Sequence, residues 1–331
     1  MRCDLFLAGE AVRSDPARVP VNLLDHAVAA ETVGFDTVWL AEHHFIRYGA
    51  CPSPPIMAAS ILARTNRLRV GTAACVLSNR HPVALAEEAV MLDAISSGRF
   101  RLGVARGGPW IDLEVFGTGA ERLESGFEET LDLVLSWLDG GEVGHAGRFF
   151  EFRSTPVLAK ASSDLGVWVA ATSQDTVDLA ASRGLPLLLG VHATDDEKIA
   201  LVNRWREVAE KNGHDPDTAE HGAVFLAFAA DSRREAVQRL RGPMTEWLSK
   251  GVGDYQRLDG SRGGRDQAEY VDRLIDTHLV GTPHHSAERL ADSVEATGIG
   301  RALLMVEGAA TASEVTENIQ RLGAELVPIV S

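Results

Sequence analysis

The sequence predicts an α/β fold in which eight parallel strands close into a TIM barrel. Short apolar runs alternate with helical patterns along the whole chain, which is typical of βα units. The runs are apolar almost throughout, as expected for strands that are covered on both faces. No linker divides the 331 residues, so we expect one domain over 1–331. The eight expected strands are 5–8, the start of 35–45, 68–76, 100–104, 167–171, 185–189, 224–229 and 302–306.

Start and stop signals place the helices between these strands. Gly34 is a C-terminal stop and Pro82 suits the first position of a helix. Apolar residues at helical spacing predict one long helix over 123–138. Three capping boxes, S/T-x-x-E, predict further helix starts. They are Thr194 with Glu197, Ser232 with Glu235, and Thr311 with Glu314.

Two segments do not fit the βα alternation. Residues 140–154 are rich in glycine with aromatic ends, which favours an inserted hairpin. Residues 251–265 are polar and rich in glycine, without apolar periodicity. We expect a long mobile loop there, at the C-terminal face of the barrel, that could act as a lid.

Composition limits the class of partner. The formal net charge is 32 − 47 = −15, which argues against nucleic acid or an anionic membrane as a partner. Cys3, Cys51 and Cys75 lie far apart, which indicates reduced thiols in a cytoplasmic protein. The start of the chain is too short and too charged for a signal peptide, and no run is long enough for a membrane span.

The carboxyl ends of the strands hold the candidate site residues, because active sites of such barrels lie at that end. The second strand ends in Glu42, His43 and His44. Because adjacent strand residues face apart, at most one of the two histidines should face a given pocket. The other strand ends carry 73–75, 105–108, Thr172, Ser173, Gly190, His192, Glu307 and Gly308.

Two of these strand ends combine into a phosphate site. Ser173 stands at an N-cap position and Thr176 lies in the first helical turn, where free N–H groups favour an anion. Arg106, one strand away, could add a bidentate cation. An ordinary cap and a surface ion pair are the alternative. Dinucleotide and P-loop motifs are absent, and the Glu42–His44 run lacks the spacing of a metal site, so we expect no metal.

With these positions in view, the chain resembles the bacterial luciferase-like flavin monooxygenases. The resemblance covers almost the whole chain. Its main blocks are GFDTVWLAEHHF at 34–45, VGTAA at 70–74 with His81-Pro82, the segment from Leu92 to Phe100 followed by Arg106-Gly107, and VGTP at 280–283 with ATGI at 296–299. FGT at 116–118 and GHD at 213–215 add to it.

The resemblance implies a barrel enzyme that uses O2 and reduced FMN, supplied by a separate flavin reductase. It implies that His43 is the catalytic histidine beside the flavin, acting as general base or proton donor, while His44 packs against or tunes it. It also implies a non-prolyl cis peptide, Ala73–Ala74, beneath the flavin ring. Arg106, Ser173 and Thr176 match its phosphate contacts. Thr172 replaces a glutamate of the light-emitting enzyme, and Arg122 is a further candidate.

Departures from the light-emitting enzyme indicate a different substrate. Ala105 stands where its catalytic subunit carries a reactive cysteine, and Gly190-Val191-His192 replaces a bulkier apolar segment. We therefore expect oxygenation of another small organic substrate, in secondary metabolism, and not of long-chain aldehydes with light emission. The candidates for the substrate pocket are His44, Cys75, Trp110, His192 and the loop 251–265. For Cys75 a place in the core is the alternative.

Two other functions remain open. The same barrel could use a deazaflavin for hydride transfer without oxygen. The chain could also be a non-catalytic flavin-binding subunit, which the presence of His43 argues against. The family further implies a homodimer formed through the helices over 56–65 and 83–95.

Overall fold

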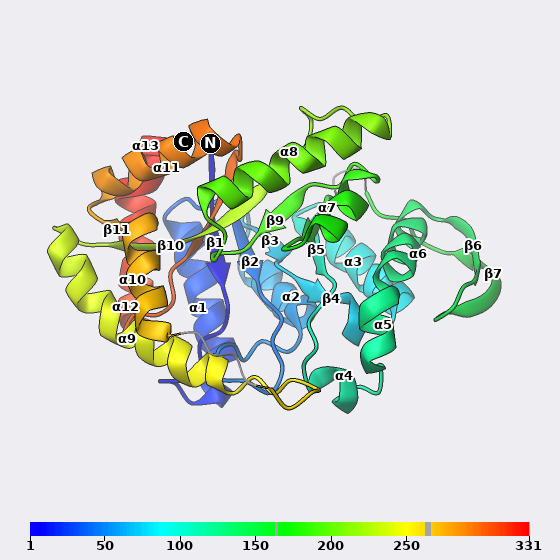
Figure 1. The fold of residues 1–331 in the computed structure, drawn as a ribbon, viewed down its shortest axis with the longest axis horizontal. Helices are drawn as coiled ribbons and strands as arrows, with labels where there is room; N and C mark the ends of the chain where they lie inside the picture. Colours follow the sequence, from blue (N-terminus) through cyan, green and yellow to red (C-terminus); the bar gives the residue numbers. More distant parts are fainter. Residues whose placement is uncertain (163–164, 262–265, 331) are drawn as a thin grey trace.

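Eight parallel strands close into a barrel with helices outside it, as the sequence predicts (Figure 1). The computed structural model describes residues 1–162, 165–261 and 266–330. Strand β1 pairs with β12 and β2, while β10 pairs with β9 and β12, which closes the ring. The barrel strands are β1 (Arg2–Leu7), β2 (Thr37–Leu40), β3 (Arg69–Thr72), β5 (Phe100–Ala105), β8 (Val167–Ala170), β9 (Leu187–Leu189), β10 (Gly222–Ala229) and β12 (Arg301–Met305).

The helices between the strands begin where the capping residues predict. Thr194 and Glu197 form a reciprocal capping box, and Ser232 and Thr311 each accept the N–H of the glutamate three residues on. Gly126 interrupts the helix expected over 123–138, so two helices replace it. The main helices are α1 (Val19–Thr32), α2 (Pro54–Arg64), α3 (Pro82–Ser96), α5 (Gly119–Ser125), α6 (Phe127–Asp139), α7 (Gln174–Ala181), α8 (Asp195–Lys211), α9 (Arg233–Gly253), α10 (Gln267–Thr277), α11 (Pro283–Thr297) and α12 (Ala312–Arg321).

The inserted hairpin is confirmed. Strands β6 (Gly141–Ala146) and β7 (Glu151–Val157) pair with each other in antiparallel order and form a separate two-stranded sheet. Figure 1 shows this hairpin beyond α6, away from the barrel strands.

Three segments differ from the sequence-based expectation. The third strand is interrupted, because β3 ends at Thr72 and a short β4 (Cys75–Val76) pairs with β5. An additional strand, β11 (Leu279–Gly281), pairs with the end of β10. The loop expected over 251–265 begins later, because α9 continues to Gly253. Residues 254–261 are not helical, and 262–265 lie outside the described residues.

The inside of the barrel is layered. Towards the N-terminal ends of the strands lie Asp4, Trp39, Trp168 and Arg301, which contact one another. One layer further along the strands lie Phe6, Leu188, Val224 and Met305, which line a cavity. Among the described residues, no helix is long and apolar enough to cross a membrane.

Candidate active site

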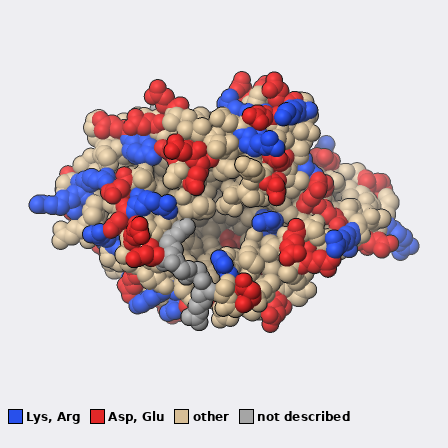
Figure 2. All heavy atoms as spheres, viewed as in Figure 1, with Lys and Arg blue, Asp and Glu red and all other residues tan. Residues whose placement is uncertain are grey.

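A cavity of about 550 Å³ opens at the carboxyl ends of the barrel strands. Figure 2 shows the hollow at the centre of this face, with acidic and basic side chains around it. Segments following β2, β3, β5, β8 and β9 all contribute to its wall. The size lies in the range of pockets that hold cofactors and small substrates.

His43 lies on the cavity wall, three residues after the end of β2. Its ring meets the ring of Tyr48 edge-on at 5.0 Å between centroids. Burial, together with the neighbouring His44, lowers the pKa of His43 to about 4. The imidazole is therefore neutral near pH 7, and one of its nitrogens is a proton acceptor.

His44 lines the same cavity, so the expectation that only one histidine would face it is wrong. The reason is local: β2 ends at Leu40, and side chains of the following loop need not alternate. The Nε2 atom of His44 lies 2.9 Å from Oε1 of Glu42, and its ring packs edge-on against Phe116.

Glu42 organises this loop, a role that its place at a strand end did not predict. Its side chain is fully buried and accepts hydrogen bonds from the Arg80 Nε atom at 3.0 Å and the Val76 N–H at 3.3 Å. With His44 as a third partner, the carboxylate ties the β2 loop to the segment after β4. Buried carboxylates are stable only when they are paired in this way.

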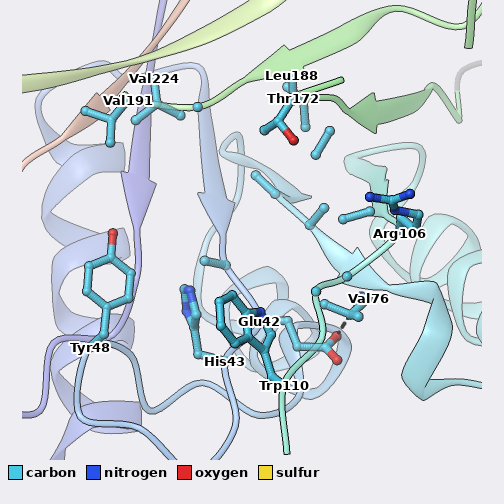
Figure 3. A pocket seen from close by; sticks show the side chains of 18 of the residues that line it. Glu42, His43, Tyr48, Val76, Arg106, Trp110, Thr172, Leu188, Val191 and Val224 are labelled. Atoms are coloured by element: carbon cyan, nitrogen blue, oxygen red, sulfur yellow. Dashed lines mark hydrogen bonds between the residues drawn. The ribbon is translucent and has the colours of Figure 1, made fainter. Parts of the chain in front are cut away.

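On another side of the cavity lies a set of anion-binding groups. The Arg106 side chain is exposed and forms no hydrogen bond or ion pair with any residue in the described part of the chain. Ser173 caps α7, and its hydroxyl lies 3.0 Å from that of Thr176. Figure 3 shows Thr172 and Arg106 on one side of the cavity, with Tyr48 on the other. Arg106, Thr172 and Thr176 line the cavity, whereas Ser173 is not part of its wall.

The Ala73–Ala74 peptide bond is cis, as the resemblance implied, and both residues line the cavity. Cys75 does not. Its side chain is fully buried, and burial raises its pKa. Alternation along β4 accounts for this, because Ala74 and Val76 on either side of Cys75 face the cavity. The prediction of Cys75 as a pocket residue is therefore wrong, and its alternative, a place in the core, is confirmed.

Trp110 and His192 line the cavity, as expected of pocket residues. Trp110 pairs with Arg257 in an isolated bridge, and its ring contacts that of Tyr255 at 4.5 Å. Tyr255 and Gln256 also line the cavity, so the described part of the expected loop reaches the site. Backbone hydrogen bonds of 2.9 Å from Ile111 to Gln256 and 3.1 Å from Leu258 to Pro109 hold it there.

Two other strand-end or motif residues have structural partners outside the cavity wall. Glu307 accepts the backbone N–H groups of the segment 8–10, and burial raises its pKa to about 7. Arg122 donates to the carbonyls of Leu77 and Arg80 and packs on Phe150. Its guanidinium is engaged there, which does not fit the expected phosphate contact.

Tyr48 is the site residue that sequence reasoning missed. It lies in the loop after β2 and lines the cavity beside His43. Its ring stacks flat on Trp247 at 4.9 Å. Because Trp247 is almost two hundred residues away in the chain, no local pattern could have shown this arrangement.

The family model for luciferase-like monooxygenases matches residues 1–301. The chain belongs to the luciferase-like monooxygenase family. An alkanal monooxygenase alpha chain from Photorhabdus luminescens is 30% identical over 321 residues, which cover 91% of this chain and 89% of the relative. Membership of this flavin-dependent family supports an oxidoreductase activity.

Several solved structures share the fold. The monooxygenase RslO1 of Streptomyces bottropensis superposes with a TM-score of 0.87 at 22% identity, over 100% of both chains. The oxygenating constituent of 3,6-diketocamphane monooxygenase from Pseudomonas putida, in complex with FMN, gives 0.78 at 20%, over 100% and 99%. An F420-dependent secondary alcohol dehydrogenase gives 0.76 at 17%, over 100% and 99%. Barrels of this shape therefore include both an FMN-bound monooxygenase component and an F420-dependent dehydrogenase.

Proposed function

We propose that this luciferase-like protein is the oxygenating component of a two-component monooxygenase, which uses reduced FMN and O2 to oxygenate a small organic substrate. The observation that carries the proposal is the division of one cavity. An arginine without a counter-charge and hydroxyls at a helix start lie on one side, and a neutral histidine lies on another. A flavin phosphate would bind the first group and leave the ring near the second.

The residues present fit FMN. Arg106 can hold a phosphate with two N–H groups, while Thr176 and the first N–H groups of α7 can donate to other phosphate oxygens. Ala73, Ala74 and Val76, which line the cavity, would provide apolar contacts for the ring. When bound, reduced FMN would supply the electrons that activate O2.

The chain itself would control protons and water. His43, neutral near pH 7, can accept a proton from the substrate or return one to the product. Glu42 and Arg80 fix the loop that carries it. Trp110 and Tyr255, held by the backbone pairing of their two segments, would exclude bulk water from the reacting groups.

Use of a deazaflavin for hydride transfer is the second candidate, because the F420-dependent alcohol dehydrogenase shares the fold over 99% of its chain. One stopped-flow experiment separates the two. The protein is mixed anaerobically with reduced FMN, O2 is admitted, and the rate of flavin reoxidation is compared with that of free FMN. We expect reoxidation to be slowed, and reduced F420 to bind more weakly than FMN. If the flavin were reoxidised as fast as free FMN and F420 bound more tightly than FMN, the deazaflavin-dependent function would replace this proposal.

We also propose a homodimer formed through α2 and α3. These adjacent helices carry three large apolar side chains that are strongly exposed: Ile56 (71%), Met91 (65%) and Ile95 (68%). Burial of such a patch is a strong driving force for association. Light scattering should give twice the chain mass, and Met91→Glu should give monomers. A flavin reductase would be a transient partner or act through free reduced FMN.

The three cysteines are free and buried, which supports our proposal of a cytoplasmic location.

The substrate would be a small organic molecule, and secondary metabolism remains our proposal for its origin. Ala105 lines the cavity in place of the reactive cysteine of the light-emitting subunit, which supports a substrate other than a long-chain aldehyde.

A further inference from the structure

Tyr48 is held rigidly beside His43. Its ring stacks on Trp247 with an angle of 5° between the planes, and it meets the His43 ring at 80°. The Trp247 Nε1–H donates to the Tyr48 carbonyl at 2.9 Å. Gly251 approaches so closely that a Cβ there would lie 2.7 Å from the Tyr48 Cα atom. Backbone and ring are therefore both fixed, although the residue lies in a loop.

Two further contacts hold the loop that carries Tyr48. Arg47 forms two hydrogen bonds of 2.8 Å with the carboxylate of Asp254, one from Nε and one from Nη2. Gly49 packs against His43, since a Cβ there would lie 2.6 Å from its Nδ1 atom. The position of the Tyr48 hydroxyl relative to His43 is thus determined by packing on three sides.

The Tyr48 hydroxyl is left without a partner. It points into the cavity (Figure 3), and no described residue forms a hydrogen bond with it. Burial raises the pKa of Tyr48, so the phenol stays protonated and can donate. A protonated hydroxyl that is fixed, partly enclosed and unpaired is suited to a ligand oxygen.

The two nitrogens of His43 differ. Nδ1 is buried without a hydrogen-bond partner, yet the Ala8 carbonyl lies near enough to favour a proton on the ring. Nε2 is neither buried nor hydrogen-bonded to a described residue, so it opens on the cavity. A proton on Nδ1, directed at the Ala8 carbonyl, leaves the Nε2 lone pair as an acceptor.

We propose that Tyr48 and His43 together bind a hydroxyl group of the substrate. The hydroxyl oxygen accepts from Tyr48 and its hydrogen is donated to Nε2 of His43. The apolar body of the substrate lies against Val191 and Val224, which lie on the same side of the cavity as Tyr48 in Figure 3. The substrate class is an apolar alcohol or phenol. This inference rests on the proposed function only in leaving the opposite side of the cavity to the flavin.

One donor and one acceptor select a hydroxyl over other oxygen groups. A ketone or an ether would accept from Tyr48 but leave Nε2 unpaired, and a hydrocarbon would leave both groups unpaired. Sites that hydrogen-bond a hydroxyl reject analogues without it, because the buried partners lose their solvation. Tyr48 is therefore a specificity-determining residue, and Nε2 of His43 is the atom that accepts the hydrogen of the substrate hydroxyl.

The test uses four probes of similar size: 2-naphthol, decahydro-2-naphthol, 2-methoxynaphthalene and naphthalene. Equilibrium dialysis gives their dissociation constants with oxidised FMN present and absent, and the FMN affinity is measured in the same samples. A net hydrogen bond contributes about 1 kcal/mol, which is about a fivefold change in affinity. We expect 2-naphthol to bind about fivefold tighter than 2-methoxynaphthalene, and the ether about fivefold tighter than naphthalene. The decahydro compound shows whether aliphatic alcohols are bound as well as phenols.

Three variants assign the two hydrogen bonds. Tyr48→Phe keeps the stacking on Trp247 and should reduce the naphthol and ether affinities to similar extents. His43→Phe should abolish only the preference of the naphthol over the ether. Tyr270→Phe removes a tyrosine hydroxyl on α10, outside the cavity wall, and should leave the ranking unchanged. Thermal melting confirms that each variant is folded.

The inference is overturned if naphthol and ether bind equally to the wild type, or if Tyr48→Phe still binds the ether about fivefold tighter than naphthalene. Tightest binding of the ether would likewise contradict the role of Nε2. Failure of FMN to bind would count against the proposed function, whereas the ranking measured without FMN would still decide the role of Tyr48 and His43.

Discussion

The two ends of the barrel differ in whether their charged and polar side chains are paired with other residues. Towards the N-terminal end, Arg301 pairs with Asp4 and, at 2.8 Å, with Glu220, and Asp4 also accepts from Trp39. At the C-terminal end, Arg106 has no partner among the described residues, and the Tyr48 hydroxyl has none either. Similar chemical groups are thus satisfied internally at one end and left unpaired at the other. The unpaired groups at the C-terminal end are therefore available to a ligand.

The largest effect should come from breaking the paired end. Arg301→Met leaves Asp4 buried without its counter-charge, which should lower the free energy of unfolding by about 3–5 kcal/mol. Urea denaturation measures the change. Arg106→Met is the matched control, because loss of an exposed unpaired arginine should change stability by less than about 0.5 kcal/mol. Equal losses of stability in the two variants would show that Arg301 is no more strongly paired than Arg106.

At the unpaired end, His43→Ala should affect chemistry and not folding. Loss of a general acid–base group lowers rates by about 100-fold or more. We expect flavin affinity to stay nearly unchanged while oxygen incorporation into product, measured by mass spectrometry with labelled O2, falls by that factor. His44→Ala is the companion variant, and it should have a smaller effect because His44 acts through Glu42. Unaltered turnover in His43→Ala would show that His43 does not act as the general acid or base.

Much of the architecture could be predicted from the sequence, because it depends on local patterns. The eight strands, the hairpin and the Thr194 capping box are set by apolar runs, glycines and a four-residue motif. The single helix predicted over 123–138 was wrong because the apolar spacing continues across Gly126, where the structure ends α5 and begins α6. Strand β11 is only three residues long, too short to show a period.

The site could be predicted in part. The resemblance pointed to the Ala73–Ala74 cis peptide and to the cavity residues around Arg106 and Thr176. Cys75 was misplaced because the orientation of its side chain depends on the short β4. Tyr48 could not be found, since its place is determined by contact with Trp247 and Gly251 across the fold.

Acid should weaken the fold through buried histidines. Burial lowers the pKa of His26, His43 and His221 to about 4 and that of His278 to about 3. Below about pH 6.5 the unfolded chain binds more protons than the folded one, so stability falls as the pH drops towards 4. Glu307, whose pKa is raised to about 7, has the opposite effect on stability, because the folded chain binds its proton at a higher pH than the unfolded chain does. It is a single group, however, against four histidines.

Urea midpoints at pH 7.5 and 5.0 measure this effect. At pH 5.0 each of the four histidines costs about 2 kcal/mol, because that pH lies about 1.5 units below the unfolded pKa and each unit corresponds to about 1.4 kcal/mol. Glu307 offsets about 2–3 kcal/mol of this, so we expect a net loss of about 5 kcal/mol. Stability that is unchanged between these pH values would show that these histidines are not buried in their neutral form.

The most direct test of the unpaired end as a flavin site is the affinity for FMN of Arg106→Ala. Loss of a charge-assisted contact with phosphate should weaken FMN binding by about 10- to 100-fold, measured by quenching of flavin fluorescence. Affinity for riboflavin, which lacks the phosphate, should change little. Arg64→Ala, an exposed arginine in the last turn of α2, is the control. Unchanged FMN affinity in Arg106→Ala would show that Arg106 does not bind the flavin phosphate.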